Sequence, residues 1–258
     1  GCGSPLPETC PACGRSVEAT ANFCSACGTD LRAPWPGTGV GGLPRSYTPR
    51  HLAEKILSSK SALEGELKEV TVLFADVANY SDLAHRLGPE EMHFIMRELF
   101  DLLLAEVHRF EGTVNQFLGD GIMALFGAPI AHEDHAHRAL HSALGMQQAL
   151  RRWYATLEKE KVVSIRMRIG VNTGPVVVGS IGDDLRMDYT AVGDTTNLAA
   201  RMQQIAEPGC ILVTEGTRRI TEGYFEFRSH GEAKVKGESQ PVEVYELIGL
   251  GEVRDKID

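Results

Sequence analysis

The sequence predicts an α+β domain that follows a small cysteine-rich module. Five of the six cysteines lie within the first 27 residues, which marks a separate unit. Two long segments carry apolar residues at helical spacing, and the other apolar segments are short, strand-like and bounded by glycines. The chain of 258 residues is 43% hydrophobic and 24% charged, enough for one sizeable domain and an appendage. We therefore expect helices on one face of a largely antiparallel sheet.

The first module, residues 1–32, is predicted to be a zinc ribbon. Its motifs CPAC and CSAC form a C-x2-C-x10-C-x2-C pattern, in which each pair of thiolates can bind the same tetrahedral zinc. Two disulfides are the alternative, but a reducing cytoplasm and a very small core favour the metal. We expect the ribbon to contact a regulatory protein partner. The predicted zinc ligands are Cys10, Cys13, Cys24 and Cys27.

Cys2 does not belong to this set of four. The phrase CGSPL at 2–6 resembles CGTDL at 27–31, which follows the last ligand of the ribbon. We infer that Cys2 is the final ligand of an earlier ribbon, so that residues 1–32 include the end of a double ribbon. The missing initiator methionine also favours a chain that is part of a longer protein.

Residues 33–67 are predicted to be a linker that contains a short helix. The stretch APWPGTGVGGLPRSY is rich in proline and glycine and has no hydrophobic periodicity. Thr48 and Pro49 then offer a cap and a first helical residue for HLAEKIL. The second domain is expected to span 68–248, with a tail at 249–258.

The first half of the second domain alternates strands and helices. EVTVLFADV at 69–77 is predicted to be a strand, and a helix opens near Gly88. The stretch TVNQFLGDGIMALFG at 113–127 predicts two strands about a tight turn. The apolar face of the helix is formed by Met92, Ile95, Met96, Leu99 and Leu103.

The second half repeats this alternation. A long helix is expected at 133–158, and IRMRIGVNTGPVVVGSIG at 165–182 is expected to supply two strands. The stretch DYTAVGDTTNLAARM at 188–202 predicts a strand that leads into a helix, and several short strands follow to about residue 247. The apolar side of the 133–158 helix carries Leu140, Ala143, Leu144, Leu150 and Leu157.

Charge and hydropathy exclude several classes of function. The net charge of −9 disfavours nucleic-acid binding, which needs a basic surface. No apolar run approaches the roughly 18 to 20 residues of a membrane span. The chain opens without a charged and apolar leader, so we expect a cytoplasmic protein that makes no membrane contact.

Two aspartates stand out at the ends of apolar strands. Asp76 closes the first strand, and Asp120 lies between two glycines at the hairpin turn. If the strands are neighbours, the two carboxylates converge and can bind Mg²⁺ while leaving room for substrate phosphates. The glycines would let a triphosphate approach the backbone. The alternative is an Asp that only satisfies turn amides.

The rest of the chain favours the first interpretation. The stretches VLFADVANYSDL, GTVNQFLGDGIMALFG, IRMRIGVNTGPVVVGSIG, DYTAVGDTTNLAARM and KVKGE, in this order, closely resemble the class III adenylate/guanylate cyclase catalytic domain over roughly residues 68–248. The resemblance implies a ferredoxin-like sheet with helices, and a head-to-tail homodimer in which each site is shared between chains.

The resemblance also implies a role for individual residues. Two Mg²⁺ or Mn²⁺ ions per site would be bound by Asp76, Val77 and Asp120. The catalytic residues would be Asn197, which orients the ribose, and Arg201, which meets developing charge. The substrate-binding residues would be Gln116, Thr190, Lys236, Asn79 and Tyr80.

Two of these positions depart from the family pattern. Asn79 replaces a common glycine in the phosphate loop, although Asn tolerates positive φ better than most residues. Gln116 replaces the purine-reading lysine of adenylate cyclases, and its partner position, Thr190, is usually Asp or Thr. We expect ATP as the substrate, with weak discrimination against GTP.

A histidine cluster near the start of the 133–158 helix lacks the pattern of a metal site. No HExxH motif is present, and the helix is amphipathic, so the cluster is interpreted as a solvated face. It consists of His132, His135, His137 and His141.

Two functional classes are consistent with the sequence. The first is a purine nucleotide cyclase that converts ATP to 3′,5′-cyclic AMP and pyrophosphate by two-metal catalysis at a dimer interface. The second is a weak or inactive nucleotide-binding module that relays a signal between the zinc ribbon and a downstream domain. The complete set of metal and transition-state residues favours the enzyme.

Overall fold

The computed structural model describes residue 49 and residues 66–157, 165–178, 194–234 and 241–251. The zinc ribbon, the linker helix, Thr190 and Lys236 lie outside these residues, so the expectations about them remain predictions. Among the described residues, no helix is both long enough and apolar enough to cross a membrane.

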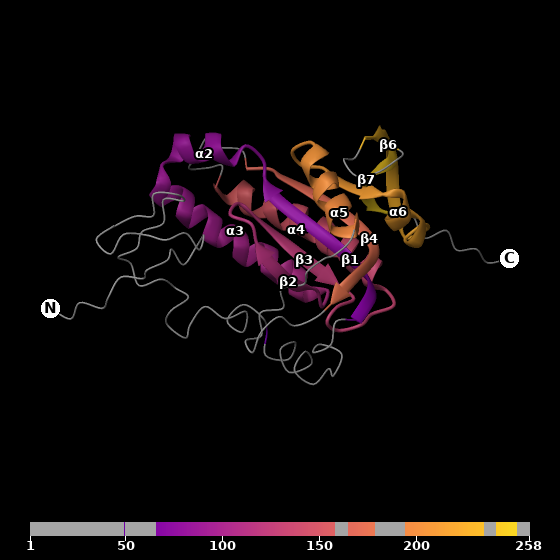
Figure 1. Ribbon diagram of the computed structural model, residues 1–258. Helices are drawn as coiled ribbons and strands as arrows, with labels where there is room; N and C mark the ends of the chain where they lie inside the picture. Colours follow the sequence, from indigo (N-terminus) through magenta and orange to yellow (C-terminus); the bar gives the residue numbers. More distant parts are fainter. Residues whose placement is uncertain (1–48, 50–65, 158–164, 179–193, 235–240, 252–258) are drawn as a thin grey trace, which may run out of the picture. The chain divides into compact units, whose positions relative to one another are not determined.

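The described strands form one seven-stranded sheet in the order β2-β3-β1-β4-β5-β7-β6 (Figure 1). The pair β4 and β5 is parallel, and the other neighbouring pairs are antiparallel. The sheet is therefore largely antiparallel, as predicted. The strands are β1 (Glu66–Val77), β2 (Thr113–Phe117), β3 (Gly121–Phe126), β4 (Met167–Val178), β5 (Ile211–Thr214), β6 (Phe225–Ala233) and β7 (Val242–Leu250).

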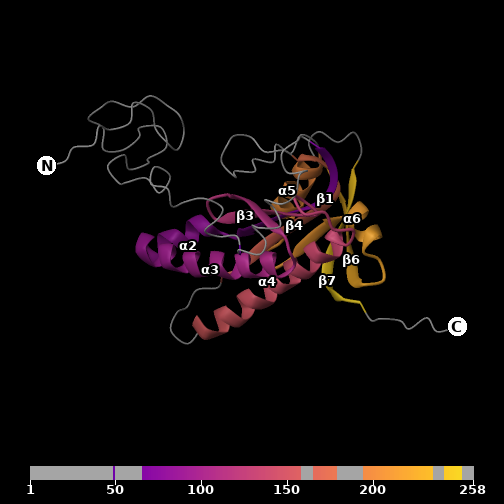
Figure 2. The same ribbon diagram turned by 90° about the horizontal axis from the view of Figure 1, so that it is seen from below.

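Helices cover both faces of this sheet, not one face as the sequence suggested. Alternate residues of β1 contribute to two separate apolar clusters, one of which includes α4 and the other α5. Figure 2 shows α3 and α4 on one side of the sheet and α5 on the other. The helices are α2 (Tyr80–Leu87), α3 (Pro89–Arg109), α4 (His135–Leu157), α5 (Asp194–Ile205) and α6 (Glu215–Ile220).

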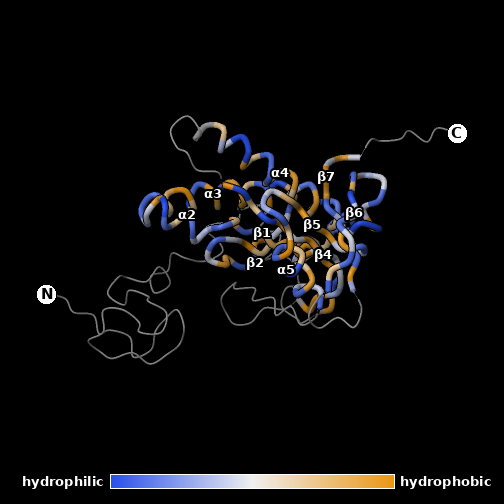
Figure 3. Tube along the Cα trace, turned by 90° about the horizontal axis from the view of Figure 1, so that it is seen from above, coloured by the Kyte–Doolittle hydropathy of each residue, from blue (hydrophilic) through white to orange (hydrophobic). Residues whose placement is uncertain are grey.

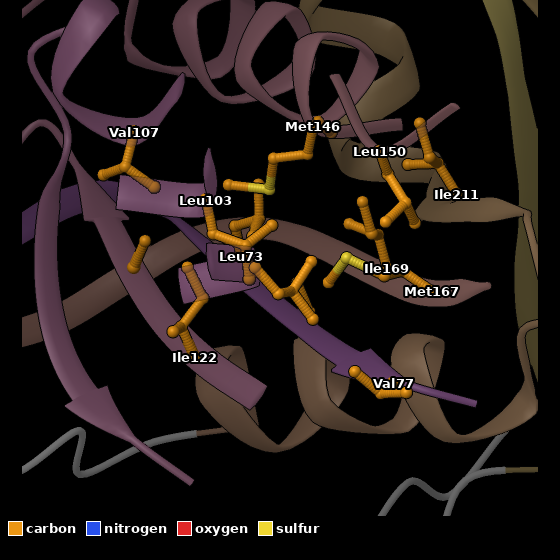
Figure 4. Close-up of a cluster of buried hydrophobic side chains, with 14 of the residues drawn as sticks. Leu73, Val77, Leu103, Val107, Ile122, Met146, Leu150, Met167, Ile169 and Ile211 are labelled. Atoms are coloured by element: carbon orange, nitrogen blue, oxygen red, sulfur yellow. The ribbon is translucent and has the colours of Figure 1, made fainter. Parts of the chain in front are cut away.

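The larger core lies between the sheet and the pair α3 and α4. Leu73 of β1, Leu103 of α3 and Met146 of α4 meet there, each with at most 1% of its surface exposed (Figure 4). Hydrophobic residues concentrate along the central strands, whereas the outer helices alternate between polar and apolar residues (Figure 3). The predicted apolar face of α3 is buried in this core.

Two domain boundaries and one strand assignment differ from the sequence-based expectation. β1 begins at Glu66, within the predicted linker, and β7 continues to Leu250, within the predicted tail. Two strands were expected in 165–182. The described part of this stretch instead forms one continuous strand, β4, which pairs with β1 without a break from Met167 to Val178. Pro175 is tolerated because β5 pairs with β4 only at residues 169–171.

The histidine face of α4 is packed on aromatic rings, so the prediction of a solvated face is wrong. The ring of His137 meets Tyr224 edge to face, with centroids 4.7 Å apart. His141 stacks on Phe110 at 5.5 Å and contacts Phe225 at 4.9 Å. These partners come from the end of α3 and the start of β6, and no helical pattern reveals them. No group of metal-binding side chains forms there among the described residues.

This packing predicts a loss of stability in acid. Burial lowers the pKa of His135 and of His141 below the ordinary imidazole value of about 6.5. The unfolded chain therefore binds protons before the folded chain does as the pH falls. The stabilisation is complete above about pH 6.5 and is lost as the pH falls from there through the lowered pKa values.

Thermal unfolding between pH 8 and pH 5 measures this effect. The variant His141→Phe keeps a ring against Phe110 and removes the proton site, so its Tm should fall less steeply with pH than that of the wild type. The matched control is His93→Gln, because His93 is exposed on α3. Equal slopes for wild type and His141→Phe would show that His141 does not contribute.

Candidate active site

The sheet brings the two predicted metal-binding aspartates together. β1 and β3 are antiparallel neighbours, and Asp76 pairs with Gly121, the residue after Asp120. The N–H of Val77 donates to the carbonyl oxygen of Asp120 at 3.1 Å. The charge of Asp120 raises the pKa of Asp76, which places the two carboxylates within electrostatic range. The strands are neighbours, as this expectation required, and metal binding by the two aspartates remains a prediction.

The glycines beside Asp120 serve the hairpin itself. Gly119 has φ of +76°, a conformation that the tight turn requires. Gly121 lies directly against β1, where a Cβ would collide with the carbonyl of Ala75 and stand 2.9 Å from the Cβ of Asp76. Gly121 therefore permits the close approach of β1 and the turn, rather than the approach of a triphosphate as the sequence suggested.

Arg168 is a candidate site residue that the sequence analysis missed. It pairs with Asp76 across β1 and β4, and its guanidinium binds the carboxylate with both ends. Nε donates to Oδ1 at 3.2 Å, and a terminal nitrogen donates to Oδ2 at 3.1 Å. The side chains of Arg168 and Asp76 remain 30% and 22% exposed. The site therefore holds a bidentate ion pair that a ligand can reach.

The pKa of Asp76 reflects several opposing influences. Burial, the largest, raises the pKa of Asp76, the Arg168 guanidinium lowers it, and the charge of Asp120 raises it again. The Gln203 side chain of α5 also favours the ionised form of Asp76. The net shift of the Asp76 pKa is upward, so burial together with the charge of Asp120 outweighs the Arg168 guanidinium.

In the loop after β1, Asn79 adopts a left-handed backbone conformation, which asparagine tolerates better than most residues. Asn79 has φ of 58° and ψ of 35°, in the left-handed region, and its carbonyl accepts the N–H of Leu83 to open α2. The N–H of Ala78 is already donated to Arg166, at 2.8 Å. The first turn of α2, which begins with Tyr80, still has N–H groups without an intrahelical acceptor. These groups can bind an anion.

Gln116 shares a face with Asp76. It pairs with Met123 of β3, which in turn pairs with Phe74 of β1, two residues before Asp76. Paired residues point to the same side of a sheet, and residues two apart on a strand do as well. The predicted base-reading side chain is exposed on the same face of the sheet as Asp76, two strands away from it.

Asn197 and Arg201 lie on α5, one helical turn apart, as expected. Asn197 is exposed. Arg201 donates to the Oε1 of Gln204 at 3.3 Å, and its Nε is buried without a hydrogen-bond partner among the described residues. Within the described part of the chain, no hydrogen bond or ion pair joins either residue to Asp76 or Asp120. The structure of one chain therefore brings the carboxylates together with Arg168 but not with Asn197 and Arg201.

The donor set fits a divalent cation that also binds phosphates. The charge of Asp120 raises the pKa of Asp76, and a carboxylate that already lies beside a second one is suited to such a cation. The described residues contain no cluster of three or more metal-binding side chains. A Mg²⁺ or Mn²⁺ ion at Asp76 and Asp120 would therefore complete its shell with backbone oxygen such as that of Val77, with water and with substrate phosphates.

Comparison with known families identifies this arrangement. A sequence model of the adenylate and guanylate cyclase catalytic domain matches residues 64–249. The chain belongs to this cyclase family. A zinc-ribbon domain model matches residues 9–31, ahead of the cyclase domain, so the predicted ribbon and cyclase order is confirmed.

Individual cyclases are similar over most of the domain. Adenylate cyclase 1 of Rhizobium meliloti (strain 1021) is 32% identical over 208 residues, covering 79% of this chain and 31% of the relative. The chain spans about a third of the length of the first curated relatives it matches. The adenylyl cyclase CyaB from P. aeruginosa superposes with a TM-score of 0.65 at 30% identity, over 72% of this chain and 96% of the other. The guanylyl cyclase Cya2 gives 0.67 at 31%, over 75% and 98%. The predicted fold class of the cyclase domain is thereby confirmed.

Proposed function

We propose that the cyclase domain converts ATP to 3′,5′-cyclic AMP and pyrophosphate. The observation that carries the proposal is the pair of converging carboxylates, Asp76 and Asp120, with the Arg168 guanidinium beside them on an accessible face. A site with two acids and one arginine suits a polyphosphate that arrives with divalent metal. The similar proteins include both adenylate and guanylate cyclases, so the choice of ATP over GTP is part of this proposal.

In the proposed reaction the ribose 3′-oxygen bonds to the α-phosphorus, and the bond from that phosphorus to the departing pyrophosphate breaks. When bound, the metal ions lower the pKa of the 3′-hydroxyl and neutralise phosphate charge. Asp76 and Asp120 would hold these ions. Asn197 would orient the ribose, and Arg201 would stabilise the charge that develops at the phosphorus.

The remaining contacts would bind the triphosphate. Lys236 is proposed to grip it, and the N–H groups at Asn79 and Tyr80 would bind its oxygens at the N-terminus of α2. Arg168 stands beside Asp76, where a polyphosphate oxygen can share its guanidinium. These groups would position the substrate, and metal held by Asp76 and Asp120 would supply the positive charge that the leaving group needs.

We propose that each site is shared between two copies of the chain. Within one chain, the described contacts of Asn197 and Arg201 do not include the carboxylate pair. A head-to-tail homodimer would place these two residues of one copy opposite the carboxylates of the other. This arrangement also follows from the class III resemblance.

A product assay tests the proposed reaction. The purified chain is given ATP or GTP with Mg²⁺ or Mn²⁺, and the products are identified by mass. We expect cyclic AMP and pyrophosphate in equal amounts, and none with Asp120→Ala. Nucleotide binding without product in either metal would favour the alternative, a signalling module between the zinc ribbon and a downstream domain.

The base-reading prediction rests on hydrogen-bond chemistry. A lysine can only donate, whereas the amide of Gln116 and the hydroxyl of Thr190 can each donate or accept. Adenine offers an acceptor at N1 and a donor at N6, and guanine offers the reverse. Neither side chain enforces one purine, so we expect an ATP preference that is weaker than that of a lysine-bearing relative.

Substitution at Gln116 measures this preference. Gln116→Lys should sharpen the choice of ATP by about 1 to 3 kcal/mol, by analogy with bidentate base contacts. Gln116→Glu, which adds an acceptor, should move the preference toward GTP. The ratio of kcat/KM for the two nucleotides is compared in all three proteins. A ratio that responds to neither change would remove Gln116 from the base pocket.

The zinc prediction concerns the segment that matches the ribbon family. We expect one zinc ion per chain, bound by Cys10, Cys13, Cys24 and Cys27, with Cys2 dispensable. Metal analysis of the reduced protein measures it, with Cys2→Ser as the control that keeps its zinc. Zinc-free protein with a folded ribbon would contradict the prediction. We propose that this ribbon binds a regulatory partner and that the protein is cytoplasmic.

A further inference from the structure

The helix that carries Asn197 and Arg201 lies directly on the backbone of β4. A Cβ on Gly170 would collide with the backbone of Ala199 and Gln203, and a Cβ on Gly174 would lie 2.7 Å from the Oγ1 of Thr195. The two glycines therefore fix how closely α5 approaches the sheet. They exert no control over its rotation or its position along its own axis, because a glycine has no side chain.

Asn172 is the one residue between these glycines that points to α5, since side chains on a strand alternate. It is 4% exposed. Its Nδ2 donates to the carbonyl of Thr195 at 2.9 Å, and its Oδ1 accepts from Thr214 at 2.6 Å. The orientation of the amide is determined, because a carbonyl can only accept.

The contact to Thr214 takes that hydroxyl away from its usual task. Thr214 is the N-cap residue of α6, a position where a threonine oxygen commonly accepts a helix N–H. Its side chain makes no capping hydrogen bond, and it donates to Asn172 instead. Asn172 therefore accepts a hydrogen bond from the end of β5 and donates one to the first turn of α5.

The tie acts at the functional end of α5. Thr195, which Asn172 binds, is two residues before Asn197, and Thr195 also donates to the carbonyl of Pro175 at 2.9 Å. Both hydrogen bonds fix the first turn of the helix relative to β4. A displacement of about 1 Å in a group that acts on the transition state can lower a rate roughly 100-fold.

We propose that Asn172 is a positioning residue that sets where Asn197 and Arg201 stand relative to the substrate. This inference rests on the proposed cyclase function. Among the described residues, the Asn172 side chain bonds to Thr195 and Thr214, and not to Arg168 or to the residues of α2 that are proposed to bind the triphosphate. Its loss therefore lowers kcat and leaves KM nearly unchanged.

The first test compares two neighbours on β4. Asn172→Asp keeps the acceptor for Thr214 and loses the donor to Thr195, and it should lower kcat roughly 30- to 100-fold with KM within about threefold. The control is Thr173→Val, whose side chain points to the other face of β4 and whose hydroxyl bonds to Thr71 of β1 and Thr217 of α6. It should leave kcat within about threefold of wild type. Equal losses of kcat in both variants would overturn the proposal.

The second test asks in which half of the shared site Asn172 acts. Mixed with Asp120→Ala, Asn172→Asp should recover to about a quarter of wild-type activity, because one site combines the two intact halves. Mixed with Arg201→Ala it should not recover. Recovery with Arg201→Ala and not with Asp120→Ala would overturn the proposal.

Two further measurements keep the test decisive. If Asn172→Asp does not fold, Thr195→Val removes the other hydrogen bond that fixes the first turn of α5. This variant should also lower kcat, to a smaller extent, and an unchanged kcat would overturn the proposal. If Asp120→Ala and Arg201→Ala do not complement each other, the shared site of the proposed function is wrong. The comparison of Asn172→Asp with Thr173→Val still decides the role of Asn172.

Discussion

Asp120→Ala and Arg201→Ala are each expected to be inactive alone and to regain activity when they are mixed. Asp120 stands in the carboxylate pair, whereas Arg201 lies on α5 and makes no hydrogen bond or ion pair to that pair within the described residues. If each site combines the two halves from different chains, half of the dimers in an equal mixture are mixed. Each mixed dimer has one intact site of two, so the activity should reach at most about a quarter of wild type.

The size of the two single losses follows from the chemistry. Removal of one group that stabilises transition-state charge lowers a rate by about 10² to 10³-fold. Loss of Asp120 removes half of the carboxylate pair, so its effect should be at least as large. The control is a mixture in which both chains carry Asp120→Ala. No recovery in the mixture, with subunit exchange demonstrated by differently tagged chains, would contradict a shared site.

Sequence patterns predicted the parts of the site that depend on local structure. Asp76 at the end of an apolar strand and Asp120 at a glycine-bounded turn were identified because strand periodicity and turn composition are local signals. Their convergence followed from one assumption, that β1 and β3 are neighbours, and the register confirms it. The left-handed conformation of Asn79 also agrees with the tolerance of asparagine for positive φ.

The parts that sequence patterns could not predict depend on contacts distant in the chain. Arg168 is 92 residues from Asp76, and only the register of β1 with β4 reveals their ion pair. The imidazole of His141 looked solvated because its aromatic neighbours come from α3 and β6. The sequence marks Asn172 only as part of a predicted strand, because its partner Thr195 lies on α5, 23 residues further along the chain. A single sequence shows periodicity and turns, but it does not show which strands pair or which helix covers them.

Arg168 also changes how the site is expected to respond to metal. Its guanidinium binds the Asp76 carboxylate through two hydrogen bonds. A divalent cation that binds without nucleotide must share this carboxylate with a fixed positive charge. A nucleotide triphosphate supplies negative oxygens, so it can draw Arg168 toward itself and relieve the repulsion. Arg168 would thus favour metal that arrives with substrate over metal alone.

Arg168→Ala should therefore have opposite effects on metal binding and on turnover. At pH 8, Mn²⁺ alone should bind more tightly by on the order of 1 kcal/mol, the scale of a partly exposed charge pair. The kcat/KM for ATP should fall roughly 100-fold, because the triphosphate loses a bidentate cation. Arg168→Lys should recover only part of this loss, since a lysine cannot bind two oxygens in a fixed plane. Arg166→Ala is the control, because it removes the same charge from an exposed position two residues away and should change both measurements little. Weaker Mn²⁺ binding together with slower turnover in Arg168→Ala would mean that Arg168 supports the site only as part of the fold. Tighter Mn²⁺ binding with slower turnover would identify Arg168 as the cation that the substrate draws away from Asp76.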